Sequence, residues 1–407
     1  MWSSHEQRIV RLGSRKLAAD PRPVIGGTVN ISRTAAAVLL AAASLLAPVP
    51  AHAAPTLAPS PVVTPTPSPI PTPSPIEVKW TSIGASLGRL GSKVGTEVSG
   101  LTNGGSMQRY DHGSIYYTKA TGAHVIEGSI GAKWIAAGAQ KSFLGYPTND
   151  IRSGLKNGGS AQSFVTGTIA ASPATGVHTA RGGIGQKWIA AGSQNGVLGY
   201  PITDEIPEVN GGEFRRGDVY QKYQGGSIYW DPVRQARIIR GAIGSLWASQ
   251  GAGLGKLGYP IGDEIGGQPR GGVVQQFQKG SQTPEIYWSP ATGAHYVLGG
   301  IQHAWGIPYI FDKIGYPITN EIGGLKNGGV YQLFQFKNGA IYYSPGSGGW
   351  PVLGAIRGAW AATGAERGRL GYPTSVEFLS FGVTVQNFQN GSISYTPTHG
   401  TSVNIWL

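Results

Sequence analysis

Hydrophobic and polar positions recur along most of the chain with a period of 54–59 residues. The clearest marker is Leu-Gly-Tyr-Pro or a close variant. Its copies begin at Leu144, Leu198, Leu257, Ile314 and Leu370, with a degenerate copy at Leu90. A fixed period of this length is typical of repeat architectures, so residues 76–407 are expected to form six units of about 55 residues.

Each repeat is expected to begin with a short helix. A tryptophan stands eleven residues before the glycine of the marker, or ten in the fifth copy, and it follows an isoleucine by four positions. This i, i+4 spacing predicts an amphipathic helix with the tryptophan in the core. These structural tryptophans are Trp134, Trp188, Trp247, Trp305 and Trp360, with Trp80 in the first copy. Gly138, Gly192, Gly251 and Gly364 are expected to end the helix.

Three strands are expected after each turn. The first carries Gln-x-aromatic, which places the glutamine and the aromatic ring on one face. The glutamines are Gln108, Gln162, Gln221, Gln275, Gln332 and Gln386. A second strand such as 115–117 follows a glycine-containing hairpin, and a short third strand contains Val125, Val297 or Val352. The expected fold class is therefore an α+β repeat protein, each unit being a short helix plus a small antiparallel sheet.

An acidic residue follows each turn, beside an apolar one. The residues concerned are Glu97, Asp150, Glu205, Glu264, Glu321 and Glu377. We expect each carboxylate to accept backbone N–H bonds in the Asn-Gly-Gly loop of its own unit, and the glutamines to satisfy strand or loop backbone. Paired catalytic carboxylates are the alternative interpretation. His124, His178 and His295 share one repeat position, where a ring nitrogen is expected to bond a turn carbonyl.

Together these motifs resemble the LGFP repeat of actinobacterial secreted proteins, with Tyr in place of the Phe. The resemblance implies a module that associates with the cell envelope, and repeats arranged like blades in a closed, β-propeller-like ring. Since the rings of the family are expected to have five repeats, six repeats leave an open, solenoid-like arc as the alternative.

The aromatic residues of the second strand are the candidates for binding carbohydrate. Flat rings with a polar edge stack on sugar faces, although such rings also fill cores. Because neighbours on a strand point to opposite faces, only one ring of each pair can face a given core. The candidates are Tyr117, Trp230, Trp288, Tyr343 and Tyr395, with the residues before them as the alternative set. The second unit has Ala170 and Ala171 here and should not bind.

The N-terminal region has the pattern of a targeting segment. Six basic residues precede an alanine-rich apolar run that closes with Ala51-His52-Ala53, which predicts a signal peptide at 1–53. Residues 54–75 contain nine prolines and no charge, so a polyproline-type linker is expected. The expected repeat boundaries are then 76–128, 129–182, 183–241, 242–299, 300–354 and 355–407. The mature protein is expected to be secreted and associated with the cell wall, with no transmembrane anchor.

Composition and charge exclude several further kinds of functional site. The chain has no cysteine, which excludes thiol nucleophiles and cysteine-ligated metals. Removal of residues 1–53 leaves 26 basic and 18 acidic residues, a net charge of +8. This charge suits acidic polymers, but it is spread along the chain, so no nucleic-acid site is expected. No cofactor or metal site is expected either.

The sequence favours recognition over catalysis. Gly84–Gly88 matches the G-x-S-x-G pattern but lacks the strand and helix of a nucleophile elbow. With the cell-envelope association that the resemblance implies, we expect a non-catalytic protein that binds wall polysaccharide of the arabinogalactan or peptidoglycan type through several repeats. The alternatives are a hydrolase of wall turnover and a lectin-like or inhibitory protein that binds another partner.

Overall fold

The computed structural model describes residues 72–207 and 217–406. The expected signal peptide and most of the expected linker fall outside these residues. The chain divides into two units, and the second, Ile70–Leu407, contains every helix and strand of the described residues.

In the described residues, the strands form six small antiparallel sheets that follow the order of the chain. The first sheet contains β1 Lys93–Leu101, β2 Gly105–Tyr110, β3 Gly113–Thr118 and β4 Gly122–Glu127. The second contains β5 Arg152–Leu155, β6 Gly159–Phe164, β7 Gly167–Ser172 and β8 Gly176–Arg181. The third contains β9 Ile206–Pro207, β10 Val219–Tyr223, β11 Gly226–Asp231 and β12 Gln235–Ile239. The fourth sheet contains β13 Tyr259–Pro260, β14 Ile265–Gln268, β15 Gly272–Gln278, β16 Glu285–Ser289 and β17 Gly293–Val297. The fifth contains β18 Val330–Leu333, β19 Ala340–Ser344 and β20 Gly348–Val352. The sixth contains β21 Phe378–Ser380, β22 Val383–Phe388, β23 Gly391–Thr396 and β24 Gly400–Ile405.

A helix precedes each sheet, as the tryptophan spacing predicts. The helices in the described residues are α1 Pro75–Ser82, α2 Gly128–Ala136, α3 Gly182–Ala190, α4 Gly241–Ser249, α5 Gly299–Trp305, α6 Ile310–Ile314 and α7 Gly354–Ala362. In α2, Ile130 and Trp134 are buried. The helix ends before Gly138, whose φ of 105° is left-handed and suits glycine at this position. The predicted helices and their terminating glycines are therefore confirmed.

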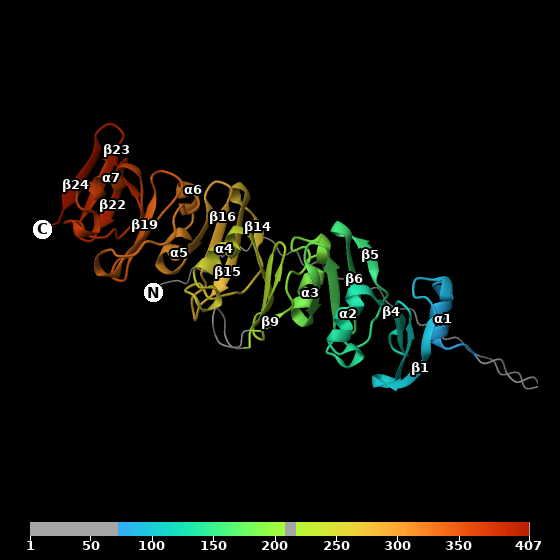
Figure 1. The fold of residues 1–407 in the computed structure, drawn as a ribbon. Helices are drawn as coiled ribbons and strands as arrows, with labels where there is room; N and C mark the ends of the chain where they lie inside the picture. The colour runs from blue at the N-terminus through green and yellow to red at the C-terminus, as the bar shows by residue number, and fades with distance from the viewer. Residues whose placement is uncertain (1–71, 208–216, 407) are drawn as a thin grey trace, which may run out of the picture. The chain divides into compact units, whose positions relative to one another are not determined.

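Helices α2 and α3 each contact both the sheet of their own repeat and the sheet before it (Figure 1). The Trp134 ring stacks on Phe164 of the following sheet at a centroid distance of 5.8 Å, and it meets Tyr116 of the preceding sheet edge-on at 4.7 Å. The same pattern recurs around Trp247 and Trp360. Every hydrophobic core of this kind therefore contains side chains from two successive repeats, because a single repeat presents too little apolar surface to form a core alone.

The outermost strand of most sheets was not expected from the sequence. Residues expected to form a loop after the Gly-Tyr-Pro turn instead pair with the glutamine strand, as β5 pairs with β6. The segment Arg152–Leu155 is largely exposed and has no apolar alternation, so it lacks the signal of a half-buried strand. The other expected strands are present in all six sheets.

The fifth repeat departs from the others after its tryptophan. Helix α5 ends at Trp305, and a second short helix, α6, replaces the single turn found elsewhere. Tyr309, the N-cap residue just before α6, has a left-handed φ of 67°. The spacing of ten rather than eleven residues in the sequence marks this departure.

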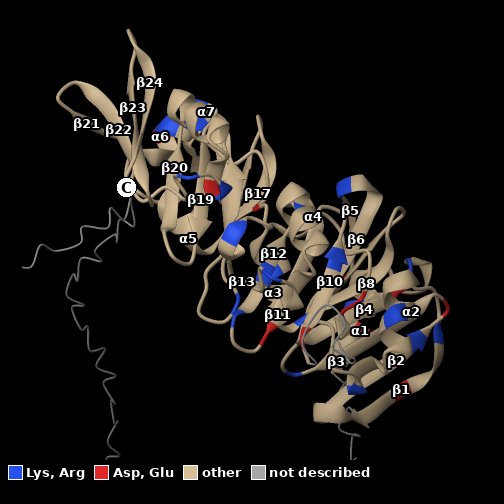
Figure 2. Ribbon diagram, turned by 90° about the vertical axis from the view of Figure 1, so that its left-hand side faces the viewer, with Lys and Arg blue, Asp and Glu red and all other residues tan. Residues whose placement is uncertain are grey.

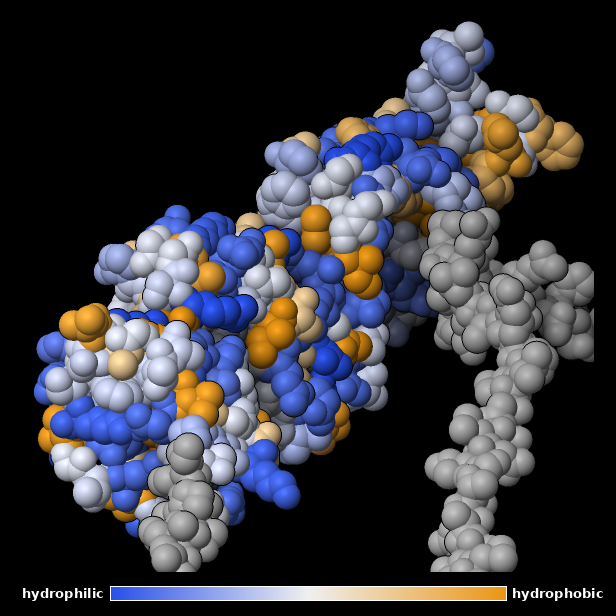
Figure 3. Space-filling view, turned by 90° about the vertical axis from the view of Figure 1, so that its right-hand side faces the viewer, coloured by the Kyte–Doolittle hydropathy of each residue, from blue (hydrophilic) through white to orange (hydrophobic). Residues whose placement is uncertain are grey.

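The surface of the repeats is mixed in character. On the face seen in Figure 3, hydrophobic side chains form separate spots among hydrophilic ones. Figure 2 shows basic and acidic residues spread over many elements rather than gathered into one charged patch. Among the described helices, none is long and apolar enough to cross a bilayer.

The fold is thus a series of repeated units with small antiparallel sheets and few helices. No sheet in the described residues closes into a barrel. Within residues 72–207 and 217–406, no hydrogen bond joins the first sheet to the last. Closure into a propeller-like ring therefore stays a prediction.

Candidate functional site

The repeated glutamines join each sheet to the sheet before it. Gln162 is fully buried, and its Nε2 donates to the carbonyl oxygens of Val125 and Asn149, both at 2.8 Å. Gln275 makes the equivalent bonds to Ile238 and Gly262 at 2.8 and 2.9 Å. The prediction that these side chains satisfy strand and loop backbone is confirmed. Their partners include the last strand of the preceding repeat.

The repeated aspartates bind the same strand of the preceding repeat, but they accept from its backbone N–H groups, whereas the glutamines donate to its carbonyl groups. The Val125 N–H donates to Asp150 Oδ1 at 3.0 Å, and the Thr179 N–H donates to Asp204 Oδ1 at 2.8 Å. Our expectation that these carboxylates bind the Asn-Gly-Gly loop of their own unit is therefore wrong. The sequence motif aligns Asp150 with Glu205, but the structure shows that Asp150 corresponds to Asp204 and that Glu205 occupies the next position.

Lysines of the helices complete these links. Lys79 forms an ion pair with Asp150, and Lys133 forms one with Asp204. Burial raises the pKa of Asp150, but hydrogen bonds from His124, Lys79 and the Val125 N–H outweigh burial and hold this pKa well below its usual range. The pKa of Asp204 is lowered by the same kind of partners against the same effect of burial. Both aspartates are therefore ionised at neutral pH and act as structural acceptors.

The Leu-Gly-Tyr-Pro marker has a tyrosine where the LGFP motif has a phenylalanine, and the hydroxyl of this tyrosine makes a hydrogen bond between repeats. Its hydroxyl reaches the loop of the preceding repeat, as Tyr200 Oη donates to the Lys156 carbonyl at 2.9 Å. Tyr146 and Tyr316 make the same bond at 2.8 Å to Thr102 and Pro269. The hydroxyl adds a link between repeats that a phenylalanine does not provide.

The histidines act as predicted. His124 and His178 place Nε2 at 2.7 and 2.8 Å from the carbonyls of Thr121 and Thr175, and Trp350 donates to Ser347 in the same way. In the part of the chain that the structure describes, no group of three His, Cys, Asp or Glu residues is arranged to hold a metal ion.

Helices pack on both faces of the strand that carries the candidate aromatic residues. Tyr117, Trp230, Trp288, Tyr343 and Tyr395 each lie toward the helix of their own repeat and are partly buried. In the alternative set, Tyr116 and Tyr342 are buried and Tyr229 and Tyr287 are partly buried, and all four lie toward the following helix. The predicted alternation of faces is confirmed, while a role of any of these rings in binding stays a prediction.

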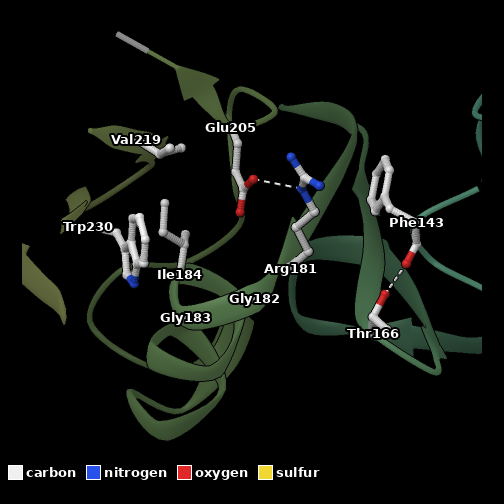
Figure 4. A pocket seen from close by; sticks show the side chains of 9 residues that line it. All are labelled: Phe143, Thr166, Arg181, Gly182, Gly183, Ile184, Glu205, Val219 and Trp230. Carbon is white, nitrogen blue, oxygen red and sulfur yellow. Dashed lines mark hydrogen bonds and ion pairs between the residues drawn. The ribbon is translucent and has the colours of Figure 1, made fainter. Parts of the chain in front are cut away.

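Trp230 lines a pocket of about 390 Å³ between the second and third sheets (Figure 4). It lies over the first turn of α3, where a Cβ on Gly183 would stand 2.8 Å from the indole ring. Gly183 is therefore required for this close approach. Ile184 and Val219 complete the apolar wall near the indole. The pocket thus combines a tryptophan ring with apolar side chains, a combination that suits the face of a sugar.

An ion pair forms the polar side of this pocket. Arg181 Nε donates to Glu205 Oε2 at 2.7 Å, and the Arg181 guanidinium lies 4.2 Å from the centre of the Phe143 ring. Burial raises the pKa of Glu205, the Arg181 charge lowers it, and burial prevails. The guanidinium is partly exposed, so it retains donors for a ligand.

The ion pair and the tryptophan recur at equivalent positions one repeat later, with Ala242 in place of Gly183. Arg240 pairs with Glu264 at 2.5 Å, and Trp288 occupies the repeat position of Trp230. Burial also raises the pKa of Glu264. The sequence motifs single out the tryptophans and the glutamates, but the arginines were missed. An arginine directly before the helix, repeated at Arg181 and Arg240, was the signal that could have identified them.

Comparison with known proteins gives a clear family result. The model of the family described as LGFP repeat matches residues 90–142, 144–196, 198–255, 257–307 and 314–368, together more than half of the chain. The matches begin at the Leu-Gly-Tyr-Pro marker or its variant in each of these repeats. No curated protein matches the chain.

Similarity to solved structures is weak. A virginiamycin B lyase from Staphylococcus aureus is 7% identical, with a TM-score of 0.12, covering 76% of this chain and 87% of the lyase. A streptogramin B lyase is also 7% identical, with a TM-score of 0.12, covering 75% and 80%. Scores of this size carry no argument about fold or function.

Proposed function

Because the chain belongs to the LGFP repeat family, we propose that it is a secreted, non-catalytic protein that binds cell-wall polysaccharide of the arabinogalactan or peptidoglycan type. The observation that carries the proposal is the pocket in which Trp230 lies near the Arg181–Glu205 ion pair. The chemistry of this pocket supports the assignment, as does the recurrence of its ion pair and its tryptophan in the next repeat.

The pocket fits a sugar residue in size and chemistry. Its volume of about 390 Å³ lies at the lower end of the range for small-molecule sites. The indole can stack on the apolar face of a pyranose or furanose ring, while the Arg181 guanidinium donates to ring hydroxyls or to an acidic substituent. Glu205 fixes the arginine and can accept hydroxyl hydrogens.

Repetition supports binding at several points along one polymer. An arginine–glutamate pair and a tryptophan recur at the equivalent positions Arg240, Glu264 and Trp288. A second kind of pocket, between a hairpin and the following helix, recurs at equivalent positions in the first two sheets, with volumes of about 520 and 420 Å³. Gly113 and Ile135 line the first of these pockets, and Gly167 and Ile189 line the second. Weak sites on one chain give a higher apparent affinity because the later contacts are intramolecular.

Net charge favours the same class of target. The chain beyond residue 53 carries a net charge of +8, which attracts polymers bearing phosphate or carboxylate groups. Salt should weaken this contribution, since exposed charges are screened beyond about 8–10 Å at physiological ionic strength.

A sedimentation assay with purified cell walls tests the proposal. The mature protein should pellet with walls and should lose binding at the step in which its polysaccharide is stripped chemically. A protein that stays in the supernatant with every preparation at low salt overturns the proposal. Release of reducing sugar or muropeptide would favour the hydrolase instead, and binding only to material from other cells would favour the lectin-like alternative.

We also propose that the repeats act as an open arc rather than a closed ring. The first repeat lacks the links to a preceding strand that the glutamine and the aspartate make in the second to fourth repeats. Thr96 stands at the repeat position of Asp150, and Gln108 donates to Val94 and Gly95 of its own sheet. A ring would need these groups to receive the edge strand of the last sheet. Small-angle X-ray scattering of the mature protein separates the two arrangements.

A further inference from the structure

A pocket lies between the fourth and fifth repeats, where the fifth repeat departs from the repeat pattern. Helix α5 ends early, and the segment from Gly306 to Tyr309 leads into α6. A pocket of about 500 Å³ opens at this point. The side chains relevant to binding are Glu285, Tyr287, Gln302, Trp305, Tyr309 and Phe311.

Aromatic rings form most of the wall of the pocket. Trp305 is 7% exposed, whereas the equivalent Trp134 and Trp360 are fully buried, so the early end of α5 uncovers part of the indole. Tyr287 meets Trp305 edge-on at 4.6 Å. Tyr309 is half-exposed and contributes the most accessible ring of the wall.

A carboxylate supplies the polar floor. Glu285 Oε2 accepts from Tyr287 Oη at 2.9 Å and from Gln302 Nε2 at 3.0 Å, and Glu285 Oε1 accepts from Gln276 Nε2 at 2.9 Å. An ionised carboxylate has about four acceptor positions, so one remains for a hydroxyl of a ligand. Burial, followed by the Glu285 charge, raises the pKa of Tyr287, so this hydroxyl keeps its proton and holds the carboxylate in place.

The charges around the pocket select for a neutral ligand. Lys313 Nζ lies 5.2 Å from the centre of the Tyr309 ring, and the Arg270 guanidinium lies 5.2 Å from the centre of the Phe311 ring. These cations disfavour an ammonium ligand at the rim, while Glu285 disfavours an anion at the floor. A polyhydroxylated ring without charge matches both conditions.

We propose that this pocket binds one neutral sugar residue of a glycan, stacked on Tyr309 and Trp305 and donating a hydroxyl hydrogen bond to Glu285. The site rests on the proposed function for its class of ligand, but it is separate from the Trp230 pocket and differs from it in charge. It gives the fifth repeat a specificity of its own.

The test is calorimetric titration with a soluble, neutral arabinogalactan oligosaccharide, comparing the full mature protein with Tyr309→Gly. This substitution removes the ring at a left-handed residue, where glycine is the least strained choice, so the melting temperature should not fall. Affinity should drop about tenfold, the scale of one lost stacking contact. Phe381→Gly is the matched control, because Phe381 is also an exposed aromatic residue with a positive φ of 50°. It should bind like the unsubstituted protein.

Two further ligands complete the test. An oligogalacturonide of the same length and tetramethylammonium should bind the pocket less well than the neutral oligosaccharide. Equal affinity of Tyr309→Gly and the unsubstituted protein for the neutral ligand, or a preference of the pocket for either charged ligand, overturns the inference. Sedimentation with walls is measured in parallel. Binding to walls without any effect of Tyr309→Gly defeats this inference alone, whereas a failure to bind walls defeats the proposed function.

Discussion

At the scale of single residues, the junction between repeats centres on the edge strand of each sheet. An exposed strand edge has unpaired N–H and C=O groups that invite association with other chains. Here the Val125 N–H is taken by Asp150 and its C=O by Gln162, both from the next repeat. The side chains that join the repeats therefore also protect their edges.

We predict that Gln275→Met destabilises the protein by about 1–3 kcal/mol, because it leaves buried carbonyl groups without donors. The methionine keeps a similar shape, so the loss reports the hydrogen bonds from Gln275 to Ile238 and Gly262. Urea denaturation measures the change. Gln186→Met, at an exposed position of α3, should change stability little, and an equal effect of both substitutions would contradict the role of Gln275.

Acid should weaken the junctions between repeats. The folded-state pKa of Asp150 and Asp204 is depressed, so their contribution is fully present above the unfolded pKa of about 4 and is lost as pH falls through the folded value. Stability measured by urea denaturation should therefore decline below about pH 4. The double substitution Asp150→Asn, Asp204→Asn should flatten this decline. An unchanged acid profile would show that the aspartates carry no such linkage.

The hydrogen-bond partner of a residue was predictable only where that partner lies in the same repeat. The bond from the histidine ring to a turn carbonyl three residues away follows from local chemistry, and the structure confirms it. The bonds from Asp150 and Gln162 to Val125 span 25 and 37 residues, and nothing in the local pattern identifies that partner. The arginine of the Trp230 pocket was missed because its glutamate lies 24 residues away.

At the scale of elements, the αL glycine after each helix determines how the chain enters the turn. Gly192 has a φ of 92°, and a Cβ there would lie 3.1 Å from the Cα of Gly196. We predict that Gly192→Ala lowers stability by about 1–2 kcal/mol through backbone strain. Thermal denaturation tests the effect.

The matched control is Gly358→Ala in α7, a helical glycine in open space. This substitution should raise stability by up to about 1 kcal/mol, because alanine is the better helix former. A loss of stability in both variants would show that the left-handed conformation is not the cause.

A helix or strand could be predicted from the sequence where its apolar residues recur with the period of that element. The helices that carry the repeated tryptophans and the three predicted strands alternate or repeat clearly, and the sequence predicts them. Strand β5 and its counterparts consist largely of exposed residues, so they form because the neighbouring strand supplies a hydrogen-bonding edge. The fifth repeat gave a signal in its shortened spacing, but Tyr309 in a left-handed conformation could not be inferred from that spacing.

At the scale of the whole molecule, the cores lie between repeats rather than within them. Residues from two successive sheets surround Trp134, Trp247 and Trp360, so each repeat depends on its neighbours for its core. The sequence predicted the six units, because the period is explicit. The sequence could not decide between a ring and an arc. That choice depends on the rotation between successive repeats and on whether the first and last repeats contact each other.

The most direct test of polysaccharide recognition compares wall binding by the unsubstituted mature protein, the double variant Trp230→Ala, Trp288→Ala, and the control Trp406→Ala. Trp406 is half-exposed on the last repeat and does not line the Trp230 pocket. Circular dichroism first establishes that each variant is folded. Sedimentation isotherms on walls should then show at least about a tenfold loss of affinity for the double variant, because two stacking sites are removed, and none for the control. Equal affinity of all three folded proteins for the walls would contradict the claim that this protein binds polysaccharide through its repeated tryptophan pockets.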